Sequence, residues 1–251
     1  MPQRNLSGWV KDLPDVRDLK ATDLVRSLAP VVLPTTYRCS ATPTILDQGG
    51  TSECVAYAHT LSRIIRQQMN NANVPKFDPD ALYKRCKELD GIPDLLGTYP
   101  RVCLDIMFKQ GMPVKNSCCR AGAFDFQYRL GGYWRIDGAV ADNDIKQILM
   151  QLGPFTAASS WYNEWGSMFN TEIFPEPTVA GGGHCYCIQG WNETGWEVDN
   201  SWGTIQWGVN GIAWMPYSMF RNVVLPEGDV WKMQGTTTFN KSFRNFIRGG
   251  K

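Results

Sequence analysis

The chain has 251 residues, of which 43% are hydrophobic, with a net charge of +1 and eight cysteines. This length and composition suit a globular protein with a substantial core, built as one large domain or as two lobes. The charge is balanced and shows no long run of one sign, which excludes the basic surface typical of nucleic-acid-binding proteins. Eight cysteines are too few in a chain this long for a disulfide scaffold, so we expect reduced thiols.

Residues 1–30 are polar and interrupted by prolines, and they lack the apolar core of a signal peptide. No apolar stretch in the chain reaches the length of a membrane span, so we expect no membrane partner. The sequence therefore favours a cytoplasmic or virion-associated protein. We interpret residues 1–30 as an N-terminal arm that lies over the main body rather than as a domain.

The stretch from Gln48 to Ala58 contains a glycine pair, two hydroxyl residues and Cys54. Thr51 or Ser52 is expected to cap a helix that runs to about residue 70, which places Cys54 in the first turn. The helix is indicated by apolar residues at helical spacing, namely Val55, Ala58, Leu61 and Ile65. A helix N-terminus stabilises the thiolate, the nucleophilic form of cysteine. The alternative is that Cys54 is a small core residue.

Two further helices are expected in the first half, one at 80–89 capped by Asp78 or Asp80 and one from 98 to 111 capped by Thr98. A fourth starts at Asp142 or Asp144 and ends at Gly153-Pro154. Short strands are expected after it, at Phe155–Ser159, Cys185–Gln189, Gly195–Val198, Gly211–Met215 and Asp229–Met233. A helical half followed by a half of short strands predicts an α+β protein with two lobes.

The chain divides on this basis into four parts. The arm covers residues 1–30, and a helical lobe carrying the nucleophile helix covers residues 31–135. A β-rich lobe covers residues 136–225, and residues 226–251 form a C-terminal strand and a polar tail.

A nucleophilic cysteine needs a base, and the chain has two histidines. His59 follows Cys54 by five positions, roughly 140° around a helix, so the two side chains cannot meet and His59 is expected to be a surface or satisfied core residue. His184 follows three glycines and opens a strand. Glycines there allow the close backbone approach that the edge of a site needs. His184 is therefore the candidate base.

The run His184-Cys185-Tyr186-Cys187 can also be read as a zinc site. On a strand the two cysteines point to one face and His184 points to the other, so the three cannot ligate one ion. The chain also has no CxxC pair. We therefore expect neither a metal nor another cofactor.

The run Asn200-Ser201-Trp202-Gly203 reads in one way as a glycine-rich loop with packed tryptophans. In the functional interpretation the side-chain carbonyl of Asn200 accepts a hydrogen bond from one ring nitrogen of His184 and aims the other at Cys54. Trp202 would then shield that bond from water, which strengthens it.

These motifs together resemble the papain family of cysteine peptidases. The matching features are Gln48 six residues before Cys54, Gly183-His184 at the head of a strand, and the run Asn200–Thr204, which is the most specific. Weaker similarity extends from about residue 9 to residue 220. The arm around Trp9 is similar to bacterial and phage-type members.

The resemblance implies a papain-like fold, in which a helical lobe and an antiparallel β-barrel-like lobe hold the site in the cleft between them. It implies an endopeptidase that acts on peptide or protein substrates through a Cys54 thioester, with His184 as general base and acid and Asn200 as its orienting residue. Gln48 and the Cys54 backbone N–H would form the oxyanion hole. The residues implied to bind substrate are Gly97, Thr98, Gly183 and Trp202.

Three positions depart from the family pattern. Val55 replaces a tryptophan, Thr51 replaces a half-cystine, and Glu53 replaces a small residue beside the nucleophile. A carboxylate facing the sulfur would raise the pKa of Cys54. The arm is also shorter than the helical propeptide of family zymogens, so another restraint on activity is expected.

Two alternatives stay open. One is a cysteine–histidine amidase that acts on peptidoglycan, although the run from Asn200 to Gly203 argues against it. The other is a papain-like module with low or no activity in a binding or structural role, for example in a phage particle.

Overall fold

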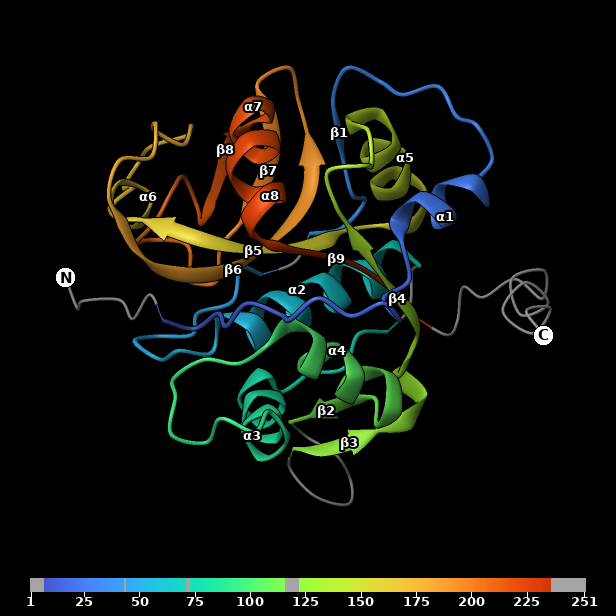
Figure 1. Ribbon diagram of the computed structural model, residues 1–251, viewed down its shortest axis with the longest axis vertical. Coiled ribbons are helices and arrows are strands. Elements are labelled where there is room, and N and C mark those ends of the chain that lie inside the picture. Colours follow the sequence, from blue (N-terminus) through green and yellow to red (C-terminus); the bar gives the residue numbers. More distant parts are fainter. Residues whose placement is uncertain (1–6, 43, 71–72, 116–121, 236–251) are drawn as a thin grey trace.

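The structure is a computed structural model that describes residues 7–42, 44–70, 73–115 and 122–235. A helical lobe and a sheet lobe lie one above the other (Figure 1). The helical lobe contains α2 (Cys54–Met69), α3 (Pro79–Leu89) and α4 (Pro100–Lys109), with a small sheet of β2 (Met112–Val114) and β3 (Ala123–Asp125). A single 3₁₀ turn, Phe126–Tyr128, leads from it to the sheet lobe.

The sheet lobe contains the remaining strands. They are β1 (Tyr37–Arg38), β4 (Leu130–Ile136), β5 (Phe155–Tyr162), β6 (Ala180–Trp191), β7 (Gly195–Asp199), β8 (Ile212–Pro216) and β9 (Asp229–Gly235). They form one antiparallel sheet of seven strands in the order β4-β9-β5-β6-β7-β8, with β1 paired to β6. Among the described residues no ladder joins β8 to β4, so the lobe is an open sheet rather than a closed barrel.

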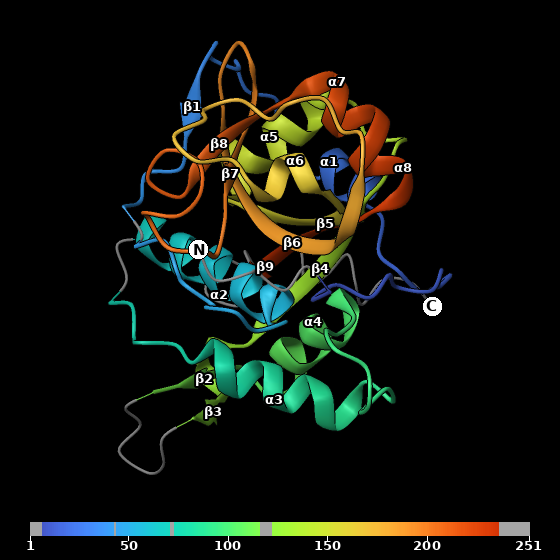
Figure 2. The same ribbon diagram turned by 90° about the vertical axis from the view of Figure 1, so that its left-hand side faces the viewer.

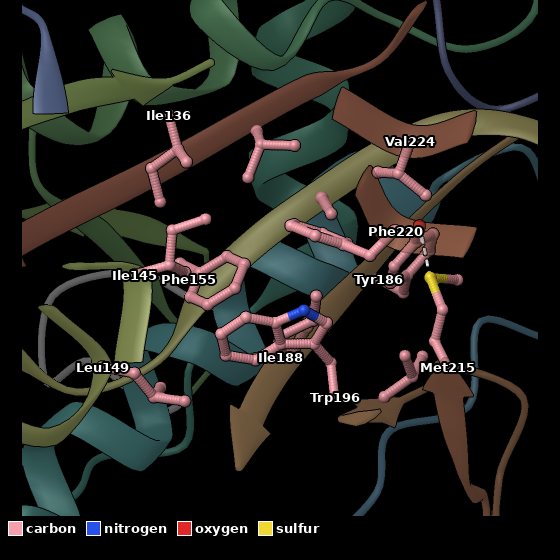
Figure 3. Close-up of a cluster of buried hydrophobic side chains, with 14 of the residues drawn as sticks. Ile136, Ile145, Leu149, Phe155, Tyr186, Ile188, Trp196, Met215, Phe220 and Val224 are labelled. Atoms are coloured by element: carbon pink, nitrogen blue, oxygen red, sulfur yellow. Dashed lines mark hydrogen bonds between the residues drawn. The ribbon is translucent and has the colours of Figure 1, made fainter. Parts of the chain in front are cut away.

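The helices of the sheet lobe are short apart from one. They are α1 (Ala21–Arg26), α5 (Asp142–Leu152), α6 (Asn163–Gly166) and α7 (Tyr217–Met219), followed by a π-helical turn (Phe220–Val224) and α8 (Leu225–Glu227). The core of this lobe lies between the sheet and these helices (Figure 3). Phe155 packs edge-on against Trp196, with ring centroids 5.8 Å apart. Phe220 closes the cluster at 6.1 Å from Phe155.

The four predicted helices and the five predicted strands are present, with ends shifted by a few residues. Local signals explain the helix boundaries. The Asp78 side chain accepts a hydrogen bond from the Ala81 backbone N–H, and Pro79 occupies the first position of α3. Gly153 ends α5 with a φ of 87°, a conformation that favours glycine. The predicted tail beyond residue 235 lies outside the described residues.

Two predicted caps are wrong. Glu53, rather than Thr51 or Ser52, is the N-cap residue of α2, and its side chain makes no capping bond. The Thr51 hydroxyl instead donates to the Gln48 carbonyl at 2.7 Å. Thr98 does not cap α4, which starts at Pro100, because its hydroxyl donates to Asp90 at 3.1 Å.

The central helix α2 lies on the side of the helical lobe that faces the sheet lobe (Figure 2). It packs against β6 and β5 on one side and against α3 and α4 on the other. Residues 54 to 63 of the helix are all buried, including the polar ones. A helix buried on all sides is held by packing rather than by intrinsic propensity, so its first turn has a fixed place relative to the sheet.

Lys232 of β9 is fully buried and closes the end of α5, and this burial lowers the pKa of its amine well below the usual value. Its Nζ donates to the carbonyls of Leu152 at 2.9 Å, Gly153 at 2.8 Å and Pro154 at 2.7 Å. Carbonyls at a helix C-terminus have no partner within the helix, and buried acceptors without a donor are costly.

We predict that Lys232→Met lowers the free energy of unfolding by about 3 kcal/mol, because it leaves these carbonyls without donors. The matched control is Lys109→Met, since the Lys109 side chain is 64% exposed and its ion pair with Asp105 lies at the surface. The control should change stability by less than about 0.5 kcal/mol. Urea unfolding measures both, and equal losses in the two variants would contradict the role given to Lys232.

Candidate active site

Cys54 is the first residue of α2, and none of its surface is exposed. Its sulfur receives a hydrogen bond from the backbone of Cys185 in β6, the residue after His184. Burial raises the pKa of the Cys54 thiol to about 12, while the backbone N–H groups of Cys185, Val55 and Cys54 itself act in the opposite direction. The thiol form is therefore favoured in the described conformation.

His184 lies in β6 and Asn200 directly follows β7. The distance from His184 Nε2 to Asn200 Oδ1 is 2.7 Å. The Ser201 backbone N–H donates to the same Oδ1 at 2.7 Å, which identifies that atom as the acceptor. A carbonyl oxygen only accepts, so Nε2 carries the proton and the neutral ring keeps Nδ1 as its basic nitrogen.

Two tryptophans surround the imidazole of His184. The Trp202 ring lies over it at 4.7 Å between centroids with an interplanar angle of 38°, and the Trp161 ring meets it edge-on, also at 4.7 Å. Trp202 is 2% exposed and Trp161 is fully buried. The bond between His184 and Asn200 therefore lies in an apolar, water-poor setting, where electrostatic interactions are stronger.

Gln48 connects the loop before α2 to the loop that carries Asn200. Its Oε1 accepts a hydrogen bond from the Ser201 hydroxyl at 2.6 Å, and its backbone N–H donates to the Ser201 carbonyl at 2.9 Å. Its Nε2 donates to the Thr51 carbonyl at 2.6 Å. An amide nitrogen carries two hydrogens, so this bond leaves one for a further acceptor.

The predicted substrate-binding residues Gly97, Thr98 and Gly183 contact the N-terminal arm. Gly97 has a φ of +81°, and a Cβ there would lie 2.6 Å from the Ser7 carbonyl oxygen. A Cβ on Gly183 would lie 2.7 Å from the Trp9 ring. Both glycines therefore permit a peptide backbone to approach closely. The fourth predicted residue, Trp202, lies over His184 as described above.

The arm itself is a part of the site that the sequence interpretation missed. Gly8 lies against Cys54, since a Cβ built on it would be 2.5 Å from the sulfur. Nothing local in the sequence marks this residue, because the contact depends on the path of the arm across both lobes. Trp161 was also missed, because it lies in β5 beyond the end of the predicted strand Phe155–Ser159.

His59 is a satisfied core residue. Its Nδ1 lies 2.7 Å from the Val55 carbonyl, and its Nε2 lies 3.3 Å from the Thr156 hydroxyl. Burial lowers the pKa of His59 to about 4, so the ring is neutral near pH 7. His184, by contrast, directly precedes Cys185, whose backbone contacts the Cys54 sulfur. In the described parts of the chain no three metal-ligating side chains group together.

Glu53 is directed to Asp80 rather than to the sulfur. The two carboxyl groups hydrogen-bond to each other, and Asp80 also accepts from the Tyr57 hydroxyl at 2.5 Å. Burial, followed by the negative charge of Asp80, raises the pKa of Glu53 to about 7. Glu53 does not contribute to the shift of Cys54, whose largest cause is burial.

The raised pKa of Glu53 predicts that the free energy of unfolding depends on pH. An unfolded glutamate has a pKa of about 4.3, so the folded protein holds this proton more tightly and loses stability as the pH rises from about 4 to about 7. The amide of Glu53→Gln keeps a donor for Asp80 without this proton equilibrium. We expect the wild type to lose more stability than Glu53→Gln between pH 5 and pH 8.

Urea unfolding at the two pH values measures this difference. Glu176→Gln, at an exposed position, is the matched control and should behave as the wild type does. The raised pKa of Glu53 would be contradicted if wild type and Glu53→Gln differed in their free energy of unfolding by the same amount at both pH values.

No model of a protein family matches the sequence, and no curated protein matches it either. Solved structures do match in fold. Xylellain, a cysteine protease from Xylella fastidiosa, superposes with a TM-score of 0.74 at 20% identity, over 93% of this chain and 98% of that one. A procathepsin B from Trypanosoma congolense gives 0.71 at 16% identity, over 93% of this chain and 87% of that one.

A cysteine protease from Carica candamarcensis, solved in complex with E-64, gives a TM-score of 0.61 at 17% identity, over 80% of this chain and 99% of that one. At these identities the likeness establishes the fold. The α+β, two-lobed arrangement described above is the papain-like fold predicted from the sequence, and it is shared with cysteine proteases.

Proposed function

We propose that this chain is a papain-like cysteine endopeptidase in which Cys54 is the nucleophile. The observation that carries the proposal is the 2.7 Å bond between His184 Nε2 and Asn200 Oδ1, made one residue away from the backbone group that contacts the Cys54 sulfur. The thiol, the imidazole and the side-chain amide are the groups that thiol catalysis requires, and these two contacts support the proposal.

In the proposed reaction His184 Nδ1 takes the proton of Cys54, and the sulfur attacks the carbonyl carbon of a peptide. The C–N bond breaks as the leaving amine receives that proton from His184, which leaves an acyl thioester on Cys54. Water then attacks the thioester, with His184 again acting as base, and the thiol is restored. Asn200 acts through His184 by holding its ring in the required tautomer, so it is a positioning residue.

The negative oxygen formed in each step needs donors. The second Nε2 hydrogen of Gln48 and the Cys54 backbone N–H at the start of α2 are suited to this role, since a helix N-terminus also favours negative charge. We assign the backbone of Gly97, Thr98 and Gly183 to holding the substrate chain. Trp202 would shield the bond between His184 and Asn200.

The substrate class under this proposal is a peptide or protein. Closeness to bacterial and phage-type members stays a prediction. In the described parts of the chain, no helix combines the length and apolar character needed to cross a membrane. A location in the cytoplasm or in a virion also stays a prediction.

A second candidate function is favoured by one observation, the complete burial of Cys54. A papain-like module with low or no activity in a binding role would need no access to the sulfur. Among the described residues, no contact specifically favours the third candidate, an amidase acting on peptidoglycan. Peptide and muropeptide digests assayed side by side separate these candidates from the endopeptidase.

We predict that Cys54→Ala abolishes hydrolysis of a peptide library and that His184→Ala lowers kcat by about 10²–10⁴-fold, because it removes the base. Cys103→Ala, at another fully buried cysteine, is the matched control for cysteine loss and should keep activity. Asn200→Ala should lower kcat less than His184→Ala does. Hydrolysis that survives in Cys54→Ala would refute the proposal.

Gln48 is tested separately by its effect on kcat and KM. Gln48→Ala should lower kcat by about 10²–10³-fold with little change in KM, because an oxyanion donor acts on the transition state. A loss of activity that lies mainly in KM would assign Gln48 to substrate binding or to loop structure instead.

A further inference from the structure

Arg63 and Arg66 are two buried arginines in the second half of α2. Arg63 is 2% exposed and Arg66 is 8% exposed. Residues three apart on a helix are neighbours on one face, so the two side chains start side by side. Burial lowers the pKa of both groups, and the positive charge of Arg66 adds to this effect at Arg63, whose pKa falls to about 10. Both guanidinium groups therefore keep their charge near pH 7.

Among the described residues, no acidic side chain pairs with these two charges. The chain has 24 aspartates and glutamates, and every one of them lies in the described ranges 7–42, 44–70, 73–115 and 122–235. Within those ranges, none of them forms an ion pair with Arg63 or Arg66. The counter-charge therefore does not come from a side-chain carboxylate of this chain.

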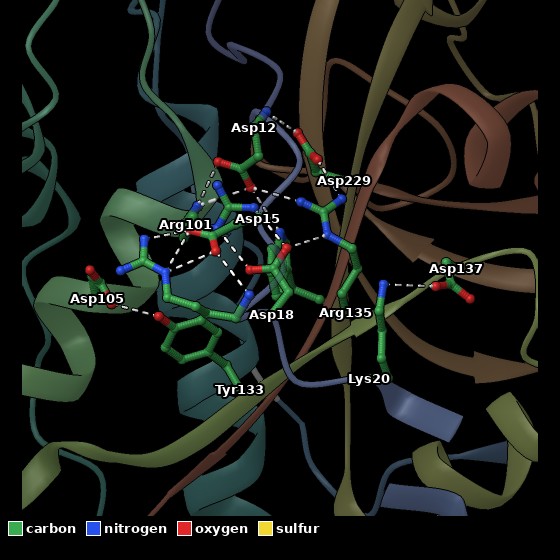
Figure 4. Close-up of polar contacts among 12 residues, drawn as sticks. Asp12, Asp15, Asp18, Lys20, Arg101, Asp105, Tyr133, Arg135, Asp137 and Asp229 are labelled. Atoms are coloured by element: carbon green, nitrogen blue, oxygen red, sulfur yellow. Dashed lines mark hydrogen bonds and ion pairs between the residues drawn. The ribbon is translucent and has the colours of Figure 1, made fainter. Parts of the chain in front are cut away.

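The arginines on the other side of the molecule have such partners, although they are only half-buried. Arg101 pairs with Asp18 at 2.8 Å, and Arg135 pairs with Asp18 at 3.1 Å and with Asp229 at 2.8 Å (Figure 4). A buried charge is costly unless it is paired and hydrogen-bonded. The more deeply buried pair on α2 thus needs a partner more, and a side-chain carboxylate does not supply it.

The hydrogen bonds of the pair lead to the same conclusion. Arg63 Nε, Arg63 Nη2 and Arg66 Nε are shielded from solvent and have no acceptor among the described residues. Arg66 lies in the last turn of α2, where the helix dipole favours a cation, but the dipole provides no acceptor for Nε. The N–H groups of a guanidinium form a rigid fork that matches the oxygens of an oxyanion.

The two side chains lie against the backbone of the sheet lobe. A Cβ on Gly235 of β9 would lie 2.9 Å from Arg63 Cζ, and a Cβ on Gly153, directly after α5, would lie 3.0 Å from Arg66 Cδ. At a rise of about 1.5 Å per residue, Arg63 and Arg66 are roughly 14 and 18 Å along the helix from Cys54. The pair is therefore separate from the proposed active site.

We infer that Arg63 and Arg66 bind a small, doubly charged oxyanion, phosphate or sulfate, which bridges α2 to the sheet lobe at the end of the helix away from Cys54. A dianion balances two guanidinium charges, whereas chloride or a single carboxylate would leave one. Its oxygens accept from the donors that have no acceptor in the described residues. The burial of Arg63 favours a free ion over a larger organic phosphate, and Arg66 retains some exposure through which the ion can enter.

The test is the thermal unfolding midpoint of the full chain at pH 8 with about 10 mM inorganic phosphate, compared with chloride at the same ionic strength. An ion that binds only the folded state raises the midpoint. We expect a rise of about 3 °C or more. Sulfate is the second arm, and the ion that gives the larger rise is the one that the site prefers.

Variants separate this site from the general stabilisation that both ions give by exclusion from protein surfaces. Arg63→Gln and Arg66→Gln should each remove most of the phosphate-dependent rise. Arg26→Gln is the matched control, because Arg26 also lies in the last turn of a helix but its side chain is 79% exposed and pairs with Asp23. The control should keep the full rise.

Equal rises in wild type, Arg63→Gln and Arg66→Gln would overturn the inference, as would a wild type that unfolds at the same temperature in phosphate, sulfate and chloride. Equilibrium dialysis of the wild type against labelled phosphate covers the case in which the variants fold poorly. One bound ion per chain is expected there, and no bound ion in dialysis against either phosphate or sulfate would equally overturn the site. Neither measurement depends on peptide hydrolysis, so the outcome is independent of the proposed function.

Discussion

The first turn of α2 packs against strand β6, and the Cys185 backbone hydrogen-bonds the Cys54 sulfur there. This contact joins the two lobes at the residue next to His184. Because α2 is buried along its first three turns and β6 is an inner strand of the sheet, neither side can shift without disturbing a core. The His59 ring adds a neutral bond to Thr156 in the same interface. Rigid elements of this kind hold side chains with the precision that a chemical site needs.

A polar network extends from this contact along the loops. Ser201 binds Gln48 through both its hydroxyl and its backbone carbonyl, and its N–H fixes the acceptor atom of Asn200. The residue proposed to hold the oxyanion and the residue that orients His184 thus share one partner. Displacement of that loop would affect both positions together. Because these bonds lie in a buried setting, each missing partner would be costly, which favours a single arrangement of the loops.

The sequence was informative where the signal is local. Apolar spacing and caps such as Asp78 located the helices, and short motifs singled out Cys54, His184 and Asn200 as candidate site residues. The strand β4 was not predicted, because its run contains Gly131 and Gly132 and is defined by pairing with β9, about a hundred residues away. The predicted cap of α2 was wrong, because the Thr51 hydroxyl donates to the Gln48 carbonyl instead. The position of Gly8 has no local signal at all, since it depends on contacts with both lobes.

The glycines at positions 97 and 183 explain why the arm can lie where it does. Glycines that let a separate peptide backbone approach closely also let the arm of the same chain approach. Backbone hydrogen bonds alone therefore do not favour the arm over a separate peptide. The ion pairs among Asp12, Asp18, Arg101, Arg135 and Asp229 fix the position of the arm, because paired buried charges specify a register even where they add little net stability. Three carboxylates face two guanidinium groups there, and burial together with Asp229 raises the pKa of Asp12 to about 7. Because Asp12 takes up a proton more readily than an ordinary aspartate, the cluster approaches charge balance near neutral pH.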